Sequence, residues 1–364
     1  MAPREAHINA ISIGVPRHEI HHLFAARGMR RLEERQRAVL ARTLQKSGIE
    51  RRYSVVEPRP ASAEELQGAS SCHALPLDAD GRYVPDNFPT TAERMRMFER
   101  EAPALAEATV RRLAVPFEGA THLVVCSCTG MAAPGVDLAL LRRLGLAPST
   151  QRTMVGFMGC YAAINALRLA RAIVRSEEGA RVLVVAVELC TLHMQETEDV
   201  ERLLSFMIFA DGCAAAMVTA EPDGLRIEDS RTALIPAADD LITWHVGDLG
   251  FEMRLSTRVP ATLGDALPDA VASMVPGGAD EIELWALHPG GKAVIDAVAR
   301  SLALTEDAVR PSREVLRDYG NMSSPSVLFV MANIMAANPS RGASGLALAF
   351  GPGVTAEGLR FAVA

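Results

Sequence analysis

The sequence predicts an α/β protein built from two similar halves, stacked as helix–sheet–helix–sheet–helix layers. Several runs of strand length are apolar on both faces, as in central strands that helices cover on each side. A long, mostly apolar helix recurs in each half. The 364 residues, 49% of them hydrophobic, also suffice for a large core or a duplicated unit.

The first half carries most of the strand signals. It begins with a predicted surface helix at Arg31–Lys46 and an irregular, proline-rich stretch at Glu57–Pro89. The strands expected next lie at Thr121–Cys128, Met154–Met158, Arg181–Cys190 and Cys213–Ala220. The helices expected in this half lie at Ala92–Leu113, Val136–Leu144 and Tyr161–Arg175.

The second half repeats this order. A strand is expected at Glu281–Leu287, helices at Lys292–Leu304 and Ser324–Ala336, and a last strand at Gly345–Phe350. Each half therefore supplies strands, a buried helix and a further strand. We place the boundary so that the halves span residues 1–220 and 221–364.

Composition excludes several function classes. The net charge is −7, and no basic stretch with interleaved aromatic residues favours nucleic acid as a partner. The longest apolar runs are too short to cross a bilayer, and the N-terminal residues do not resemble a signal peptide. Six cysteines without disulfide-scaffold spacing favour free thiols in the cytoplasm. The spacing of Cys126 and Cys128 is too short for an ordinary zinc site, so we expect no metal.

Cys160 is the first candidate for a reactive group. It follows a short apolar strand and opens an apolar helix. The first N–H groups of a helix carry partial positive charge, which favours the nucleophilic thiolate. Gly159 allows a tight turn into that helix. Taken alone, Cys160 is better explained as a small buried hydrophobic residue, the common fate of a free cysteine.

Two further residues change that balance. His288 closes a predicted strand and is followed by Pro-Gly-Gly, which leaves room for a substrate beside the backbone. Asn321 precedes the second apolar helix, where Ser323 or Ser324 could cap the helix and leave the amide free. A cysteine, a histidine and an asparagine at such junctions suit thioester chemistry. The cysteine accepts an acyl group, and the other two stabilise an oxyanion or enolate.

These residues lie in blocks that resemble a known family. The segments MGCYAAINALR around Cys160, LHPGGKAVID around His288 and DYGNMSS around Asn321 look like the catalytic blocks of type III polyketide synthases. These are the chalcone synthase-like enzymes of the thiolase superfamily. The segments KSGIERRY, CTGMAAPGVD and AFGPGV match further family blocks. The resemblance covers the chain from about residue 40 to its end and implies a thiolase-like, duplicated αβαβα fold.

The resemblance also implies a mechanism. A starter acyl-CoA loads onto Cys160, and malonyl-CoA is decarboxylated while His288 and Asn321 hold its carbonyl. The resulting enolate attacks the acyl group on Cys160 in a Claisen condensation, and cyclisation releases the lengthened chain. No cofactor and no acyl carrier protein are required, and a homodimer is expected. Phe209 and Phe251 match two gatekeeper phenylalanines that keep the reacting carboxylate dry.

Other positions follow from the same resemblance. Arg42, Lys46, Gly290 and Gly291 match positions that contact CoA. Those that match the substrate cavity are Cys128, Thr129, Ala133, His193, Gly351 and Pro352. Cys128, His193 and Ala133 depart from the plant pattern, and the first two look more like bacterial members. Together they favour a fatty acyl starter with a pyrone or resorcinol product over chalcone formation.

Two rival hypotheses remain at the level of sequence. A ketoacyl synthase III-type enzyme of fatty acid synthesis shares the fold and the trio, but Phe209, Phe251 and the Gly351-Pro352-Gly353 ending disfavour it. A non-catalytic acyl-CoA-binding protein on the same fold is disfavoured because the trio is intact.

Overall fold

A computed structural model of the chain describes residues 4–28, 32–59, 78–84, 86–236 and 238–364. Most of the stretch predicted to be irregular at Glu57–Pro89, including Cys72, lies outside the described residues. The helices are α1 (His21–Gly28), α2 (Glu34–Gln45), α4 (Thr91–Val110), α5 (Val136–Leu144), α6 (Ala162–Ser176), α7 (Val200–Ile208), α8 (Val259–Met274), α9 (Lys292–Ser301), α10 (Glu306–Tyr319) and α11 (Pro325–Ala336).

One mixed sheet of nine strands runs through both halves, in the order β11-β12-β13-β8-β1-β7-β6-β4-β5. Its strands are β1 (Ala6–Gly14), β4 (His122–Ser127), β5 (Gln151–Gly156), β6 (Val182–Leu189), β7 (Asp211–Thr219), β8 (Leu225–Leu234), β11 (Leu284–Leu287), β12 (Ser344–Gly351) and β13 (Thr355–Val363). Two small ribbons pair β2 (His18–Glu19) with β3 (Tyr53–Ser54) and β9 (Ile242–Gly247) with β10 (Gly250–Leu255).

The sheet shows the duplication directly. Strands β4, β6, β7 and β1 pair in the same order and sense as β11, β12, β13 and β8: the first pair is parallel, and the next two are antiparallel. The two series meet where β1 pairs antiparallel with β8. The predicted boundary after residue 220 falls between β7 and β8 and stays a prediction.

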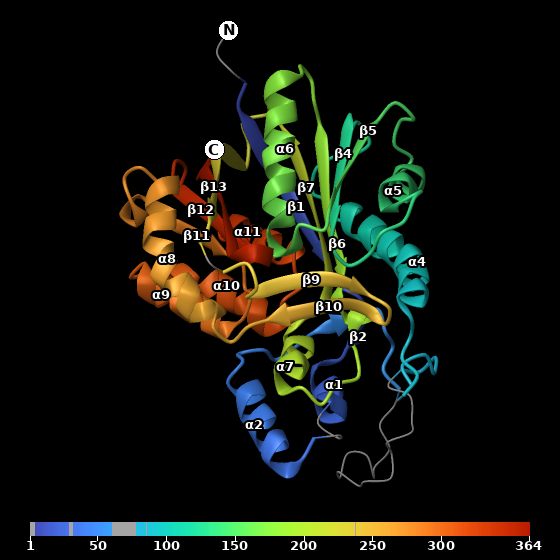
Figure 1. The fold of residues 1–364 in the computed structure, drawn as a ribbon. Coiled ribbons are helices and arrows are strands. Elements are labelled where there is room, and N and C mark those ends of the chain that lie inside the picture. The colour runs from blue at the N-terminus through green and yellow to red at the C-terminus, as the bar shows by residue number, and fades with distance from the viewer. Residues whose placement is uncertain (1–3, 29–31, 60–77, 85, 237) are drawn as a thin grey trace.

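Three hydrophobic clusters fill the spaces between the five layers of helices and strands. Successive residues of β6, such as Val184 and Val185, point to opposite faces of the sheet. On the outer face of the first half, the strands pack against α4 and α5. On the outer face of the second half they pack against α8, α9 and α10. Between the two sets of strands lie α6 and α11, as Figure 1 shows. The predicted layered fold is confirmed.

A fourth, smaller cluster joins α1, α2 and α7 beside the main stack. In it Leu40 of α2 and Met207 of α7 are buried together. Figure 1 places these helices at one end of the molecule, below the β9–β10 hairpin. This end carries the outer cavity described below.

Candidate active site

Cys160 lies in a single 3₁₀ turn, Gly159–Tyr161, between β5 and α6. Gly159 has a φ of +73°, and a Cβ atom on it would collide with Pro352. A Cβ on Gly351 would lie 2.6 Å from Cδ1 of Tyr161. Gly351 and Pro352, predicted to shape the substrate cavity, thus pack directly against the turn that carries the cysteine.

The ionisation of Cys160 differs from the sequence-based expectation. Burial raises the pKa of its thiol to about 12. The hydroxyl of Ser323, 3.5 Å from Sγ, works in the opposite direction, and the negative charge of Glu188 raises the pKa further. The shift therefore runs opposite to the one expected from the start of a helix.

Asn321 is held on both its backbone and its side chain. Its backbone N–H donates to the Ile208 carbonyl at 3.0 Å. Asn321 also forms an isolated β-bridge with the next residue, the gatekeeper candidate Phe209. Its Oδ1 accepts from the Ser323 N–H at 2.8 Å, and its Nδ2 donates to the Gly290 carbonyl at 3.3 Å. One N–H of the amide therefore remains available to a ligand.

The cap predicted for α11 is not made. Ser324 occupies the N-cap position but makes no side-chain cap bond, and its hydroxyl donates to Glu188 instead. The hydroxyl of Ser326 accepts the N–H of Met322. The helix begins at Pro325, whose missing N–H reduces the need for a cap.

His288 directly follows β11 and is 2% exposed. Neither ring nitrogen has a hydrogen-bond partner among the residues that the structure describes. Burial lowers the pKa of this imidazole to about 3, so the ring is neutral. A Cβ placed on Gly290 would lie 3.7 Å from Nε2, so His288 adjoins the residue that Asn321 binds. A chain of contacts thus joins Cys160, Ser323, Asn321 and Gly290, and His288 lies beside its last member.

Glu188 is an important residue of the site that the sequence reasoning missed. It is fully buried at the end of β6, and its carboxylate accepts from Ser324 Oγ at 2.6 Å, Thr129 Oγ1 at 2.7 Å and the Cys128 N–H at 2.9 Å. Burial raises its pKa, while these donors oppose the rise. An acid within the apolar run RVLVVAVELC was the available signal. The Glu188 carboxylate thus accepts hydrogen bonds from both halves of the chain.

The residues matched to the substrate cavity differ in what they contact. Cys128 Sγ lies 3.4 Å from the Ser323 hydroxyl, which also contacts Cys160. Thr129 turns its hydroxyl towards Glu188. His193 is 1% exposed, and both of its ring nitrogens bind backbone groups. His193 therefore packs inside the wall instead of presenting a free polar group to the cavity.

Ala133 is exposed on the surface of this chain. It lies in the loop between β4 and α5, near Met131, which is 53% exposed. On the edge strand β5, Met154 is 41% exposed, and Met158 after it is 37% exposed. These side chains form an apolar edge next to the turn that carries Cys160.

An outer cavity of about 720 Å³ lies between α2, α7, the end of β10 and the start of α9. Lys46, Gly290 and Gly291 line it, as the resemblance implied, whereas Arg42 does not. Lys292, at the start of α9, is a further lining residue. Lys46 forms no ion pair with the described residues. Because Gly290 also accepts from Asn321, the cavity leads towards the trio.

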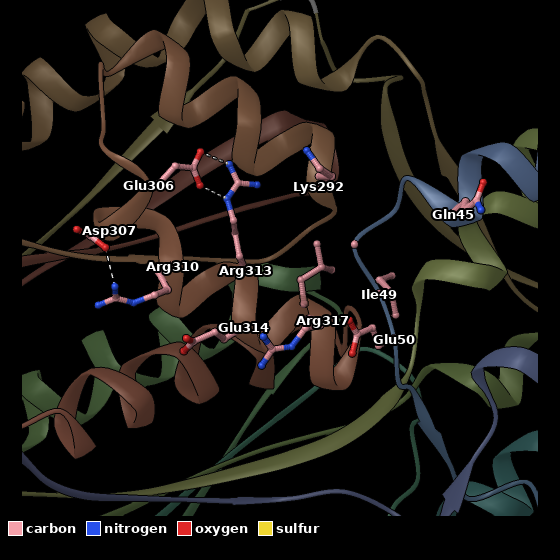
Figure 2. Close-up of a pocket in the computed structure, with 12 residues that line it drawn as sticks. Gln45, Ile49, Glu50, Lys292, Glu306, Asp307, Arg310, Arg313, Glu314 and Arg317 are labelled. Atoms are coloured by element: carbon pink, nitrogen blue, oxygen red, sulfur yellow. Dashed lines mark hydrogen bonds and ion pairs between the residues drawn. The ribbon is translucent and has the colours of Figure 1, made fainter.

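A second cleft, of about 590 Å³, adjoins this cavity and shares Lys292 with it. Figure 2 shows its wall of charged side chains from α10. Every cation there is already paired: Lys292 with Asp296, and the arginines with the acids drawn beside them or next in sequence. The cleft therefore offers compensated charge.

The described residues contain no group of three or more His, Cys, Asp or Glu side chains arranged to hold a metal ion. Across the same residues, no helix has the length and apolar character needed to cross a bilayer.

Comparison with known proteins decides the family. The profile of the N-terminal domain of chalcone and stilbene synthases matches residues 84–222, and that of their C-terminal domain matches residues 226–363. The chain is a member of the chalcone and stilbene synthase family. It is thus a type III polyketide synthase and a condensing enzyme of the acyltransferase class, which sets aside the ketoacyl synthase III hypothesis.

Two relatives and two solved structures are similar to this chain. The alpha-pyrone synthesis polyketide synthase-like protein Pks18 of Mycobacterium tuberculosis is 33% identical over 97% of this chain and 90% of its own length. Polyketide synthase 37 of Dictyostelium discoideum is 36% identical over 66% of this chain and 9% of its own length. PKS-I from the brown alga Ectocarpus siliculosus superposes with a TM-score of 0.86 at 30% identity, covering all of both chains. The C-terminal type III domain of Steely1 from Dictyostelium, at 23% identity and a TM-score of 0.83 over 99% of each chain, matches in fold.

Proposed function

We propose that this polyketide synthase extends a fatty acyl starter with malonyl-CoA and releases a cyclic pyrone, with a resorcinol as the second candidate product. The observation that carries the proposal is the chain of contacts from Cys160 through Ser323 and Asn321 to Gly290. Beside Gly290 lies the ring of His288, whose nitrogens have no partner among the described residues. The pyrone is favoured because the relative Pks18 bears the name of an alpha-pyrone synthesis enzyme.

Loading uses Cys160 and His288. The thiol sulfur attacks the thioester carbonyl of the starter acyl-CoA, and the neutral imidazole takes the proton as the S–C bond forms. The same proton then passes to the departing sulfur of CoA. The buried imidazole suits this exchange because it is uncharged before substrate arrives.

Extension uses His288 and Asn321. As malonyl-CoA loses CO₂, negative charge develops on its thioester oxygen, and the free N–H of the Asn321 amide and a ring N–H of His288 stabilise it. The enolate carbon then attacks the acyl group on Cys160, forming a C–C bond and breaking the C–S bond. Because Oδ1 of Asn321 is fixed by the Ser323 N–H and one N–H is bound to the Gly290 carbonyl, the amide presents its remaining N–H to the substrate.

The roles of the remaining residues belong to the same proposal. Phe209 and Phe251 separate the outer cavity from the reacting groups. Lys46, Gly290 and Gly291 hold CoA in the outer cavity. No cofactor and no acyl carrier protein is needed. A cytoplasmic location is proposed because the five described cysteines are all free thiols.

A homodimer is also proposed, with the edge strand β5 and Met131 at the contact between copies. The exposed methionines and the unpaired edge of β5 support it, since such an edge is normally covered. Light scattering after gel filtration should report a dimer, and Met154→Glu should shift it to a monomer. A monomer in the unaltered protein would contradict this.

The decisive experiment supplies a panel of acyl-CoA starters of increasing chain length together with malonyl-CoA, and identifies the products by mass. The proposal expects pyrones or resorcinols from long-chain starters. The matched control replaces malonyl-CoA with the malonyl form of an acyl carrier protein. Condensation seen only with that carrier would overturn the proposal.

A further inference from the structure

His193 occupies a position between two segments of the site. Its Nε2 lies 2.7 Å from the Thr129 carbonyl, and its Nδ1 accepts the N–H of Phe251 at 2.9 Å. The proton of the neutral ring therefore sits on Nε2. Because both nitrogens are engaged by backbone groups and the residue is 1% exposed, His193 has no atom left to exchange a proton with substrate.

The imidazole also stacks on the ring of Phe251. Their centroids are 4.1 Å apart and their planes differ by 12°. Two more aromatic rings meet Phe251 edge-on: Phe157 at 5.5 Å and Trp244 at 5.8 Å. The indole N–H of Trp244 donates to the Cys128 carbonyl at 2.7 Å. The gatekeeper candidate is thus enclosed on several sides and is 1% exposed.

Phe157 connects this cluster to the nucleophile. It lies three residues before Cys160 and has a φ of +59°, a strained value for a residue with a side chain. Such a conformation persists only where the surroundings enforce it, and the ring of Phe251 is one of those surroundings. A displacement of Phe251 would therefore shift Phe157 and, with it, the turn that carries Cys160.

A buried arginine fixes the turn on which His193 sits. Arg94 donates to the carbonyls of Leu192 and Met194, on either side of His193. The side chain of Arg94 also packs against Gly250, which precedes Phe251: a Cβ atom on Gly250 would lie 3.0 Å from Nε of Arg94. Arg94 thus braces both segments that His193 joins.

We propose that His193, braced by Arg94, is a positioning residue that holds the Phe251 ring against Phe157 and thereby couples decarboxylation to condensation. The inference rests on the proposed function. With Phe251 fixed, water is kept from the enolate, which attacks the acyl group on Cys160. With Phe251 loose, the enolate carbon takes a proton from water and leaves as acetyl-CoA.

The test measures the ratio of acetyl-CoA to polyketide formed from malonyl-CoA, together with kcat and KM for malonyl-CoA. In His193→Asn, an oxygen near the position of Nδ1 can still accept from Phe251. His193→Gln retains only a donor near the position of Nε2. The ratio should rise about tenfold in H193Q and less in H193N, since misplacement costs the condensation step more than the decarboxylation step.

Two controls separate positioning from general damage. His122 is buried at the start of β4, away from the trio, and its replacement in His122→Gln should leave the ratio unchanged. In the double variant of His193→Gln with Phe251→Leu, the ratio should equal that of Phe251→Leu alone, because His193 acts only through Phe251. If the His193 variants do not fold, Trp244→Phe, which loses the bond to Cys128, should raise the ratio by a smaller factor.

An unchanged ratio of acetyl-CoA to polyketide in folded His193 variants would overturn the inference, and so would additive effects in the double variant. If the His193 variants do not fold, an unchanged ratio in Trp244→Phe would overturn it. These outcomes are distinct from failure of the proposed function, in which the unaltered protein would form no polyketide from any starter.

Discussion

The two halves of this polyketide synthase follow one plan but hold their reactive groups differently. In the first half, Cys160 precedes the buried helix α6, and its sulfur contacts one hydroxyl, that of Ser323. In the second half, Asn321 precedes the buried helix α11, and its amide and backbone are bound at several atoms. A nucleophile must keep its reacting atom free, whereas a charge-stabilising donor works best when its direction is fixed.

The largest expected effect comes from breaking the first half alone. Cys160→Ala should lower condensation by about 10³-fold or more, because no acyl group can be held. Decarboxylation of malonyl-CoA should persist, since His288 and Asn321 remain. Chromatography of products from labelled malonyl-CoA would show acetyl-CoA without polyketide. Full condensation in this variant would refute the division between the halves.

Breaking the second half alone should give the converse result. Asn321→Ala should slow decarboxylation by about 10²–10³-fold, as with loss of one oxyanion donor. Acylation of Cys160 by the starter, read by intact mass, should continue. Asn165→Ala is a matched control, because that buried amide has no partner among the described residues. Equal loss of both steps in Asn321→Ala would argue against separate roles.

Glu188 joins the halves, so its replacement tests their coupling. In Glu188→Gln, an amide NH₂ would face groups that now donate hydrogen bonds to the carboxylate. The loss of one such hydrogen bond should lower the free energy of unfolding by about 1–3 kcal/mol. The pKa of Cys160 should fall, because Glu188 raises it.

The measurements are a denaturant titration and the rate of iodoacetamide labelling against pH. Since the pKa of Cys160 lies near 12, labelling of the unaltered protein should rise about tenfold per pH unit up to pH 9. The variant should label faster at each pH. A plateau below pH 8 in the unaltered protein would show a pre-formed thiolate.

The smallest expected effect lies outside the two junctions, in the outer cavity. Lys46→Ala should raise KM for malonyl-CoA about two- to fivefold with kcat unchanged, the effect of losing one exposed charge. Arg42→Ala on the same helix is the matched control and should change KM less, because Arg42 does not line the cavity. Equal effects would restore the sequence-based assignment of both residues to CoA.

The sequence predicted the elements with a strong apolar pattern well and several strands of the large sheet poorly. Val136–Leu144 matches α5 at both ends, and the expected strands at Thr121–Cys128 and Arg181–Cys190 match β4 and β6 within one residue. Strands β1, β8 and β13 of the large sheet were missed. β8 is partly exposed and mixes polar with apolar residues, so its pattern is weak, and its place is set by pairing with distant strands.

The sequence by itself determined which groups are available for chemistry, because each lies in a short local block: a cysteine before one buried helix, an asparagine before another, a histidine at a strand end. The tertiary structure alone decided how those groups are held and ionised. Ser324 reaches Glu188 across 136 positions. The burial that raises the pKa of the Cys160 thiol and lowers the pKa of the His288 ring comes from packing of both halves. Hydrogen-bond partners and solvent exclusion depend on which distant segments meet, and no local pattern records that.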